Sequence, residues 1–320
     1  MSAATYPIDL TPPDISAYAQ GNTGIPFVWT FDSGTPGPHV ALTAVVHGNE
    51  PCGAIALDWM LAQDLRPAQG KLSFAFVNTA AYHAFDPADP NASRWVDEDF
   101  NRLWSPQVLD SAERMLTVEL ARAREIRPWL DTVDLLLDIH SMQHKTEALM
   151  LAGPLAKGRG LARAVGVPAV VVSDSGHAEG VRMRDYARFV DPQSSRNALL
   201  VECGQHWEAP AADIALDTAL AFLAATGAVP VEYAAAHRPL PAPDTMRFYE
   251  VSGPVTVETE DFRFADDWRG FEHLPEGTLI ARDGNREIRA PHATTVLIMP
   301  SLRLSPGKTA VRLAQPVSEG

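Results

Sequence analysis

Histidine and glutamate, two residue types that bind zinc, stand three positions apart in His47-Gly-Asn-Glu50, just after the apolar run Val40–Val46. Zinc binds imidazole nitrogen together with carboxylate oxygen, and a catalytic zinc site has three protein ligands and an open position for water. The spacing alone is not specific, because His144…Glu147 and His273…Glu276 repeat it in the same chain. The position of each pair relative to the predicted strands must therefore distinguish them.

Short apolar segments rich in valine, leucine and isoleucine are predicted to be strands covered on both faces. They are Val40–Val46, Leu72–Val77, Leu135–Ile139, Leu149–Ala152, Ala169–Ser173 and Ala198–Val201. Helical patterns lie between them: one begins at Pro51, one runs from Ser111 to near Pro128 with Leu116 facing inward, and one spans about Ala211 to Ala225. This alternation predicts an α/β fold with a mostly parallel central sheet flanked by helices.

Polar side chains follow three of these predicted strands. His47 and Glu50 come after the first, His140 comes after Leu135–Ile139, and Glu202 comes after Ala198–Val201. Ligands of open α/β sheets bind beyond the carboxyl ends of the strands, so the fold can bring these four side chains to one rim. Taken singly, each is an ordinary loop histidine or capping carboxylate; together, they favour one shared site.

The segment Arg94-Trp-Val-Asp-Glu-Asp-Phe-Asn101-Arg102 offers two arginines and an asparagine beside aromatic residues. A guanidinium group binds a planar carboxylate through two parallel hydrogen bonds, so this segment is suited to an acidic substrate. The alternative is a solvated loop in which its three acidic residues neutralise both arginines.

The composition of the 320-residue chain restricts the possible partners. A net charge of -14 argues against nucleic acid and anionic membranes as partners, so any site for an acidic substrate must be built locally from arginines. The N-terminal sequence does not resemble a secretory signal, and no apolar run approaches the ~18–20 residues of a membrane span. With only two cysteines, the chain is expected to be cytoplasmic and reduced.

The composition and the hydrophobic pattern of the sequence change near residue 234. Residues 1–233 are expected to form the catalytic domain, and the stretch 234–244, rich in Pro and Ala, is expected to be a linker. In residues 245–320, short β-like runs alternate with turn signals such as Pro275-Glu-Gly277, which predicts a small β-sandwich or barrel domain.

The motifs resemble those of the succinylglutamate desuccinylase/aspartoacylase family, a branch of the zinc carboxypeptidase-like hydrolases. The resemblance rests on His47-Gly-Asn-Glu50, the segment from Arg94 to Arg102, Asp138-Ile-His140 and Glu202-Cys-Gly204, which occur in the family's order. The C-terminal β region looks like the family's smaller second domain, so the resemblance covers most of the chain.

The resemblance implies a role for each of these residues. One Zn²⁺ per chain would be bound by His47, Glu50 and His140. Glu202 would act as general base and then acid, Arg94 would polarise the scissile carbonyl and hold the oxyanion, and Asn101 and Arg102 would bind a substrate carboxylate. Asp99 would brace its segment, and Asp138 would orient a ligand histidine or line the pocket.

The expected function is that of a zinc-dependent amidohydrolase, or deacylase, which cleaves the amide of a small N-acyl amino acid or N-acylated amine with metal-activated water. The alternatives are a zinc carboxypeptidase acting on short peptides and a non-catalytic binding protein that keeps the fold. The expected partner is a small N-acyl substrate carrying a carboxylate, with no nucleic acid and no membrane; self-association into a homo-oligomer is left open.

One stretch departs from the family pattern. Members that act on short acyl-amino acids hold the acyl-side carboxylate with a tyrosine and an arginine shortly before the catalytic glutamate. Here the stretch Arg182–Arg196 offers several arginines and Tyr186 without a spacing that aligns. The identity of the acyl group is therefore not predicted.

Three further residues near the motifs have two interpretations each. Cys52 and Cys203 are interpreted as small buried thiols, with a nucleophile or a redox pair as the alternative. His206 either lines the pocket or packs where the next helix begins.

Overall fold

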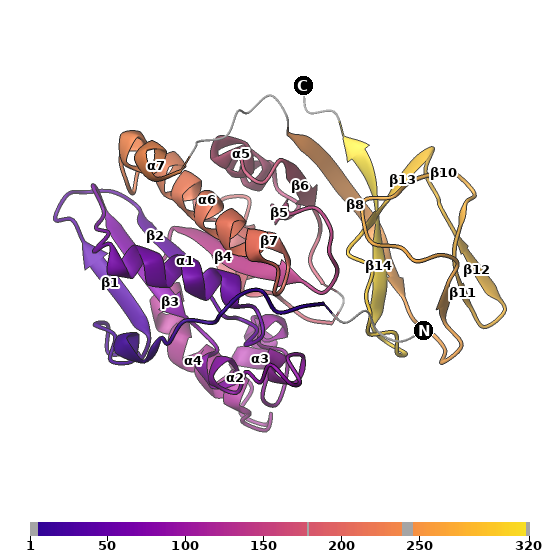
Figure 1. Ribbon diagram of the computed structural model, residues 1–320, viewed down its shortest axis with the longest axis horizontal. Helices are drawn as coiled ribbons and strands as arrows, with labels where there is room; N and C mark the ends of the chain where they lie inside the picture. The colour runs from indigo at the N-terminus through magenta and orange to yellow at the C-terminus, as the bar shows by residue number, and fades with distance from the viewer. Residues whose placement is uncertain (1–5, 178, 239–245, 318–320) are drawn as a thin grey trace.

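The structure is a computed structural model that describes residues 6–177, 179–238 and 246–317. An 11-stranded sheet runs through it in the order β1-β3-β2-β4-β7-β5-β6-β8-β14-β13-β10, and a 3-stranded sheet has the order β12-β11-β9 (Figure 1). The strands are β1 (Val28–Asp32), β2 (His39–Ala44), β3 (Lys71–Phe76), β4 (Leu135–Met142), β5 (Leu149–Leu151), β6 (Val170–Ser173), β7 (Asn197–Gln205), β8 (Arg247–Thr256), β9 (Arg263–Phe264), β10 (His273–Pro275), β11 (Leu279–Asp283), β12 (Arg286–Arg289), β13 (Thr294–Ile298) and β14 (Thr309–Val317). The α-helices are α1 (Pro51–Ala62), α2 (Thr79–His83), α3 (Pro106–Leu109), α4 (Val118–Leu130), α5 (Ala156–Val165), α6 (Ala209–Ala225) and α7 (Val231–His237).

The middle of the large sheet is parallel, as predicted. β3, β2, β4 and β7 pair in parallel, and each is buried along nearly its whole length. β5 pairs antiparallel with β7, and the short strand β1, which the sequence analysis did not predict, pairs antiparallel with β3. The carboxyl ends of β2, β4 and β7 therefore meet at one edge of the sheet, where the predicted site residues lie.

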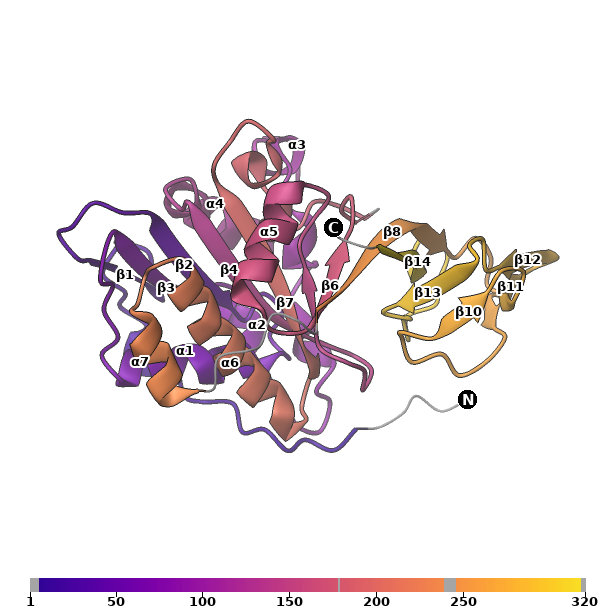
Figure 2. The same ribbon diagram turned by 90° about the horizontal axis from the view of Figure 1, so that it is seen from above.

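Helices cover both faces of this sheet (Figures 1 and 2). Leu42, Leu137 and Leu199 pack in the core that contains α1 and α6, whereas the neighbouring residues Ala41, Leu136 and Ala198 pack in the core that contains α4. Side chains alternate between the two faces of a strand, and here both faces are apolar. This explains why these strands read as continuous apolar runs.

The helix predicted from Ser111 begins later than expected. Thr117 is its N-cap and accepts a hydrogen bond from Leu120 N at 3.0 Å, so α4 starts at Val118 and continues through Pro128 to Leu130. Leu116 was expected to face inward, but it precedes the helix and is 62% exposed. Apolar spacing alone missed this cap, because a threonine side chain that bonds the backbone sets the helix start.

The C-terminal strands continue the same sheet and form a lobe to one side (Figure 2). β8 connects the two parts, since it pairs in parallel with β6 and antiparallel with β14. The predicted β-rich C-terminal region is confirmed, and its core includes Val255, Ile280 and Val311. Residues 234–237 of the predicted linker instead form the last part of α7, because alanine favours a helix. Residues 239–244 lie outside the described residues, and the division into domains stays an interpretation.

In the part of the chain that the structure describes, no helix has the length and apolar character needed to cross a membrane.

Candidate active site

A sharp turn after β2 places His47 and Glu50. Val45 has a φ of 57°, in the left-handed region that a β-branched residue rarely adopts, and Glu50 is the N-cap of α1 with Pro51 in the first helical turn. Strained backbone of this kind persists only where the surrounding structure enforces it, and such strain clusters at functional sites. The turn faces both side chains toward β4.

Gly48 is required by close packing inside this turn. A Cβ atom on Gly48 would lie 2.3 Å from the carbonyl carbon of Ala81 and 2.4 Å from the carbonyl oxygen of Ser93, distances that no side chain can occupy. Gly48 N also donates to Arg94 O at 3.2 Å. The turn that carries His47 and Glu50 and the segment that begins at Arg94 are therefore held against each other through backbone contacts.

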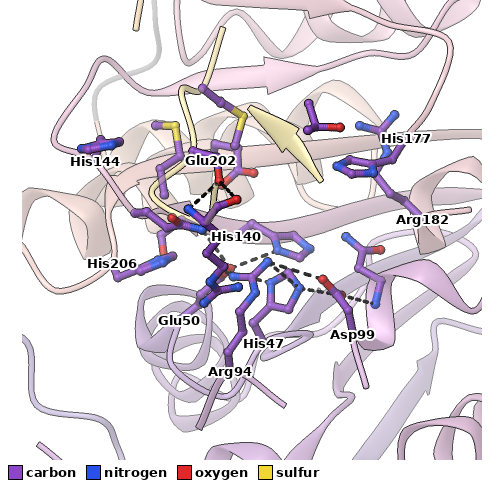
Figure 3. A pocket seen from close by; sticks show the side chains of 18 of the residues that line it. His47, Glu50, Arg94, Asp99, His140, His144, His177, Arg182, Glu202 and His206 are labelled. Carbon is purple, nitrogen blue, oxygen red and sulfur yellow. Dashed lines mark hydrogen bonds and ion pairs between the residues drawn. The ribbon is translucent and has the colours of Figure 1, made fainter. Parts of the chain in front are cut away.

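His47, Glu50 and His140 converge, with their ligand atoms all within 4.8 Å of one another (Figure 3). Glu50 Oε1 lies 2.8 Å from His47 Nδ1, and Glu50 Oε2 lies 3.0 Å from His140 Nδ1. All three residues are buried. His144…Glu147 and His273…Glu276 form no such group among the described residues, so the tertiary structure singles out one of the three repeated spacings.

Two carboxylates support the outer nitrogens of these histidines. Asp99 Oδ1 lies 3.0 Å from His47 Nε2, and Asp138 Oδ2 lies 2.9 Å from His140 Nε2, while Thr43 donates to the other Asp138 oxygen at 2.8 Å. A carboxylate on the outer ring nitrogen fixes the tautomer and makes the inner nitrogen a better metal ligand. The arrangement leaves both Nδ1 atoms facing the Glu50 carboxylate, so this donor set suits zinc.

Charge around the ligands follows from this network. Burial raises the pKa of Glu50, but the neighbouring His47 and His140 outweigh it and hold the pKa well below its ordinary value. Burial lowers the pKa of His140, but Asp138 and Glu50 outweigh it and raise the pKa well above its ordinary value. The site is thus built around opposite charges that stabilise each other in a buried position.

Glu202 lies on β7 next to His140 on β4, because the two residues are register partners in the parallel pair. Both were predicted to follow their strands, whereas β4 and β7 extend past them. Burial raises the pKa of Glu202 to about 8, and its Oε2 atom has no hydrogen-bond partner within the described part of the chain. A carboxyl group that exchanges a proton near neutral pH is suited to general acid–base catalysis.

Arg94 reaches the same centre from the segment after α2. Its Nη1 donates to Glu50 Oε1 at 3.1 Å, its Nη2 lies 3.0 Å from His47 Nε2, and the buried Nε has no partner among described residues. The guanidinium also lies 5.6 Å from the ring centroid of Trp95. Arg94 therefore lies beside the candidate metal ligands, and its Nε–H group has no acceptor among the described residues.

The Asn101 and Arg102 side chains line the same pocket, but Asn101 is partly engaged. Asn101 Oδ1 accepts from Met183 N at 2.8 Å, which leaves its amide nitrogen to face a substrate. Arg102 Nη1 donates to the carbonyl of Asn101 at 2.8 Å, and its Nη2 lies 3.8 Å from Asp99. Asp99 thus braces this segment as expected, since it also accepts from Asn101 N at 2.9 Å.

The pocket includes residues that the sequence analysis did not assign. His177 and Glu179 come from the connection after β6, and Arg303, Lys308 and Arg312 come from β14 and the connection before it. Figure 3 shows His177 and Arg182 on one side of His47, Glu50 and His140, and His144 and His206 on the other. One signal was present in the sequence: Arg312 interrupts an otherwise apolar run, Ala310–Ala314.

Other candidates have structural partners. Tyr186 hydrogen-bonds Asp131 and Arg127, and the Arg184 and Arg196 side chains donate to backbone carbonyls. Within the stretch Arg182–Arg196, only Arg182 lines the pocket. Cys52 and Cys203 are free and buried, which agrees with their interpretation as packed thiols. His206 lines the pocket and contacts Ser141 at 2.9 Å.

Residues 36–257 match the sequence model of the succinylglutamate desuccinylase/aspartoacylase catalytic domain. The chain is 23% identical to a succinylglutamate desuccinylase of Shewanella woodyi over 312 residues, covering 88% of this chain and 83% of that protein.

Solved structures are similar in fold. A succinylglutamate desuccinylase from Vibrio cholerae superposes with a TM-score of 0.67 at 19% identity, covering 91% of this chain and 86% of that one. The product-bound ectoine utilization protein EutE (DoeB) from Ruegeria pomeroyi has a TM-score of 0.59 at 18% identity, covering 89% and 86%. At these identities the structural likeness shows the fold alone.

Proposed function

The chain belongs to the succinylglutamate desuccinylase/aspartoacylase family of hydrolases, and on this premise we propose that it is a zinc-dependent amidohydrolase that deacylates a small N-acyl amino acid or N-acylated amine. The observation that carries the proposal is the convergence of His47, Glu50 and His140 beside Glu202, whose Oε2 atom has no hydrogen-bond partner among the described residues. Two histidines and one carboxylate are a ligand set of catalytic zinc sites, which keep a position for water.

Each residue of the pocket then has a chemical task. Zinc bound by His47, Glu50 and His140 would act as a Lewis acid and would lower the pKa of a water molecule bound to it towards ~7. Glu202 accepts the proton of the attacking water and returns it to the leaving amine nitrogen, which breaks the C–N bond. Its raised pKa suits both transfers, because the carboxyl group gains and loses a proton near neutral pH.

Arg94 stabilises the negative charge that develops on the amide oxygen. Its side chain lies beside the proposed metal ligands and is only 12% exposed, and a donor aimed at a developing oxyanion stabilises it most where little water is present. Asn101 Nδ2 and the Arg102 guanidinium bind a carboxylate of the substrate, which fixes the amide bond relative to Glu202.

The proposal is tested with a panel of N-acetyl-, N-succinyl- and N-formyl-amino acids, assayed with zinc and with chelator. We expect hydrolysis that chelator abolishes and zinc restores, together with about one zinc per chain by metal analysis. Hydrolysis of short peptides added to the same panel would instead indicate a carboxypeptidase. Hydrolysis that survives chelation would contradict the proposal, and a protein that neither binds zinc nor turns over any substrate would instead be the non-catalytic binding protein.

A further inference from the structure

The pocket carries more positive charge than its proposed chemistry requires. Arg182 and Arg269 pair with carboxylates that do not line the pocket. The rest of the described lining includes five cationic side chains, Arg94, Arg102, Arg303, Lys308 and Arg312, and four carboxylates, Glu50, Asp99, Glu179 and Glu202. The chain as a whole has a net charge of -14, so this excess is local. Zinc adds to it, and one substrate carboxylate on Arg102 does not balance it.

Arg182, the one arginine of the stretch Arg182–Arg196 that lines the pocket, is bound by carboxylates of the chain itself. Its Nη1 and Nη2 donate to the two oxygens of Asp174 at 2.9 and 2.6 Å, and its Nε donates to Asp185 at 2.5 Å. The residue is 2% exposed. Because all three nitrogens already have carboxylate acceptors, Arg182 serves to hold this connection in place.

Arg312 is the opposite case. It projects from β14, is 8% exposed and lines the pocket, yet its guanidinium makes no hydrogen bond to another residue of the described chain. Its nearest carboxylate is Asp174, at 3.9 Å from Nε, and that group is already bound by Arg182. Burying a guanidinium group raises the free energy of the folded chain unless an acceptor pairs with it. We therefore expect an anion from outside the chain to bind here.

His177 adds a neutral donor beside the same arginine. Its Nδ1 accepts from Glu179 N at 3.2 Å, so the ring proton is on Nε2. Burial and the nearby Arg102, Arg312 and Arg182 together lower the pKa of His177 to about 2, so the ring is neutral at physiological pH. The Nε2–H group can therefore donate to an anion without adding a charge.

We propose that Arg312 is a specificity-determining residue: its guanidinium, assisted by His177 Nε2–H, binds an anionic group of the substrate in addition to the carboxylate assigned to Arg102. The inference rests on the proposed function, because it concerns the same pocket. The C-terminal sheet thereby supplies a substrate contact that Arg182, bound by Asp174 and Asp185, does not provide.

The test compares acids with their isosteric amides in each half of the substrate. N-acetylglutamate against N-acetylglutamine varies the amine half, and N-succinylalanine against N-succinamylalanine varies the acyl half. We expect the natural enzyme to prefer the acid in one pair by about 10- to 100-fold in kcat/KM, as a charge-assisted hydrogen bond allows. The pair that shows the preference identifies the half that carries the anion.

Arg312→Met should remove most of that preference, and Arg312→Lys should keep part of it, because lysine keeps the charge but not the planar fork. Arg286→Met is the matched control, since Arg286 lies on β12, is about half exposed and pairs with Glu258. A preference that Arg312→Met leaves intact overturns the inference, as does its absence in both pairs for the natural enzyme. Thermal melting establishes that each variant is folded.

A binding measurement separates this inference from the proposed function. Calorimetry on the zinc-loaded protein compares glutarate with its monoamide, which differ by one charge. Tighter binding of glutarate that Arg312→Met or Arg312→Lys weakens supports the anion site even if no N-acyl amino acid is hydrolysed. Equal binding of both ligands by the natural protein contradicts it, whatever the activity.

Discussion

His140 on β4 and Glu202 on β7 are direct register partners in adjacent parallel strands. This pairing places a proposed metal ligand and the proposed general base side by side on strands that are buried along nearly their whole length, rather than on loops. The distance between them is set by the strand spacing of the sheet. The two groups can therefore be tested separately without disturbing the fold.

Glu202→Gln keeps the shape of the side chain and removes its ability to exchange a proton. We expect kcat to fall by about 10²–10⁴, with zinc content unchanged, because general acid–base catalysis contributes on this scale. The measurement is steady-state kinetics together with metal analysis. Glu147→Gln, at an exposed carboxylate paired with Arg247, is the control and should retain activity. Full activity in Glu202→Gln would exclude Glu202 as the base.

Glu202 also makes the metal-free protein sensitive to pH. Its folded pKa of about 8 lies above its ordinary value of 4.5, so its contribution to stability is fully present below about pH 4.5 and is lost as the pH rises through 8. With chelator present, we expect the natural protein to lose more thermal stability between pH 5 and pH 8.5 than Glu202→Gln does. Parallel melting curves for the two proteins would show that Glu202 is not perturbed in this way.

Asp138→Asn tests the support of the ligand His140. The amide keeps the size of the side chain but weakens the contact to His140 Nε2, now 2.9 Å. Loss of an outer carboxylate of this kind costs about 10- to 100-fold in metal affinity or activity. Zinc competition against a chromogenic chelator measures the change directly. A zinc affinity equal to that of the natural protein would mean that Asp138 does not support His140 as a metal ligand.

Arg94→Met tests the proposed oxyanion contact. We expect kcat to fall by about 10²–10³ with a smaller change in KM, because the donor acts on charge that appears only in the transition state. Arg247→Met, at a half-exposed surface position, is the matched control. A rise in KM alone would instead assign Arg94 to ground-state binding of the substrate.

Glu119 on α4 fixes the segment that carries Arg94 and Arg102. It is 0% exposed, and its carboxylate accepts from the backbone N–H groups of residues 96, 97 and 98 at 2.7, 3.0 and 3.3 Å. Glu119→Gln replaces one acceptor by a donor, so we expect a loss of about 1–3 kcal/mol in unfolding free energy, measured with urea.

The same substitution should lower kcat/KM, because both arginines lose their fixed backbone. Glu125→Gln, on the exposed part of the same helix, is the control and should change neither stability nor activity. A destabilised Glu119→Gln with unchanged kcat/KM would separate the fold of this segment from its role in the pocket.

The sequence by itself determined the central strands of the sheet and the polar residues near their ends, but not the edge strand β1. Apolar periodicity reports burial over a few neighbouring residues, so it located β2, β4 and β7 and, with them, the four residues His47, Glu50, His140 and Glu202. It located the strand ends less well, because β4 and β7 continue to pair through backbone hydrogen bonds beyond their apolar runs. It also missed the start of α4, because the Thr117 side chain caps that helix.

Only the tertiary structure decided which charged groups are free to act. His47 has two rivals with identical spacing, and spatial convergence with His140 separates them. Arg182 and Arg312 both line the pocket, yet one is bound by Asp174 and Asp185 and the other has no hydrogen-bond acceptor among the described residues. The partner of a charge is set by contacts between distant parts of the chain, which local patterns do not encode.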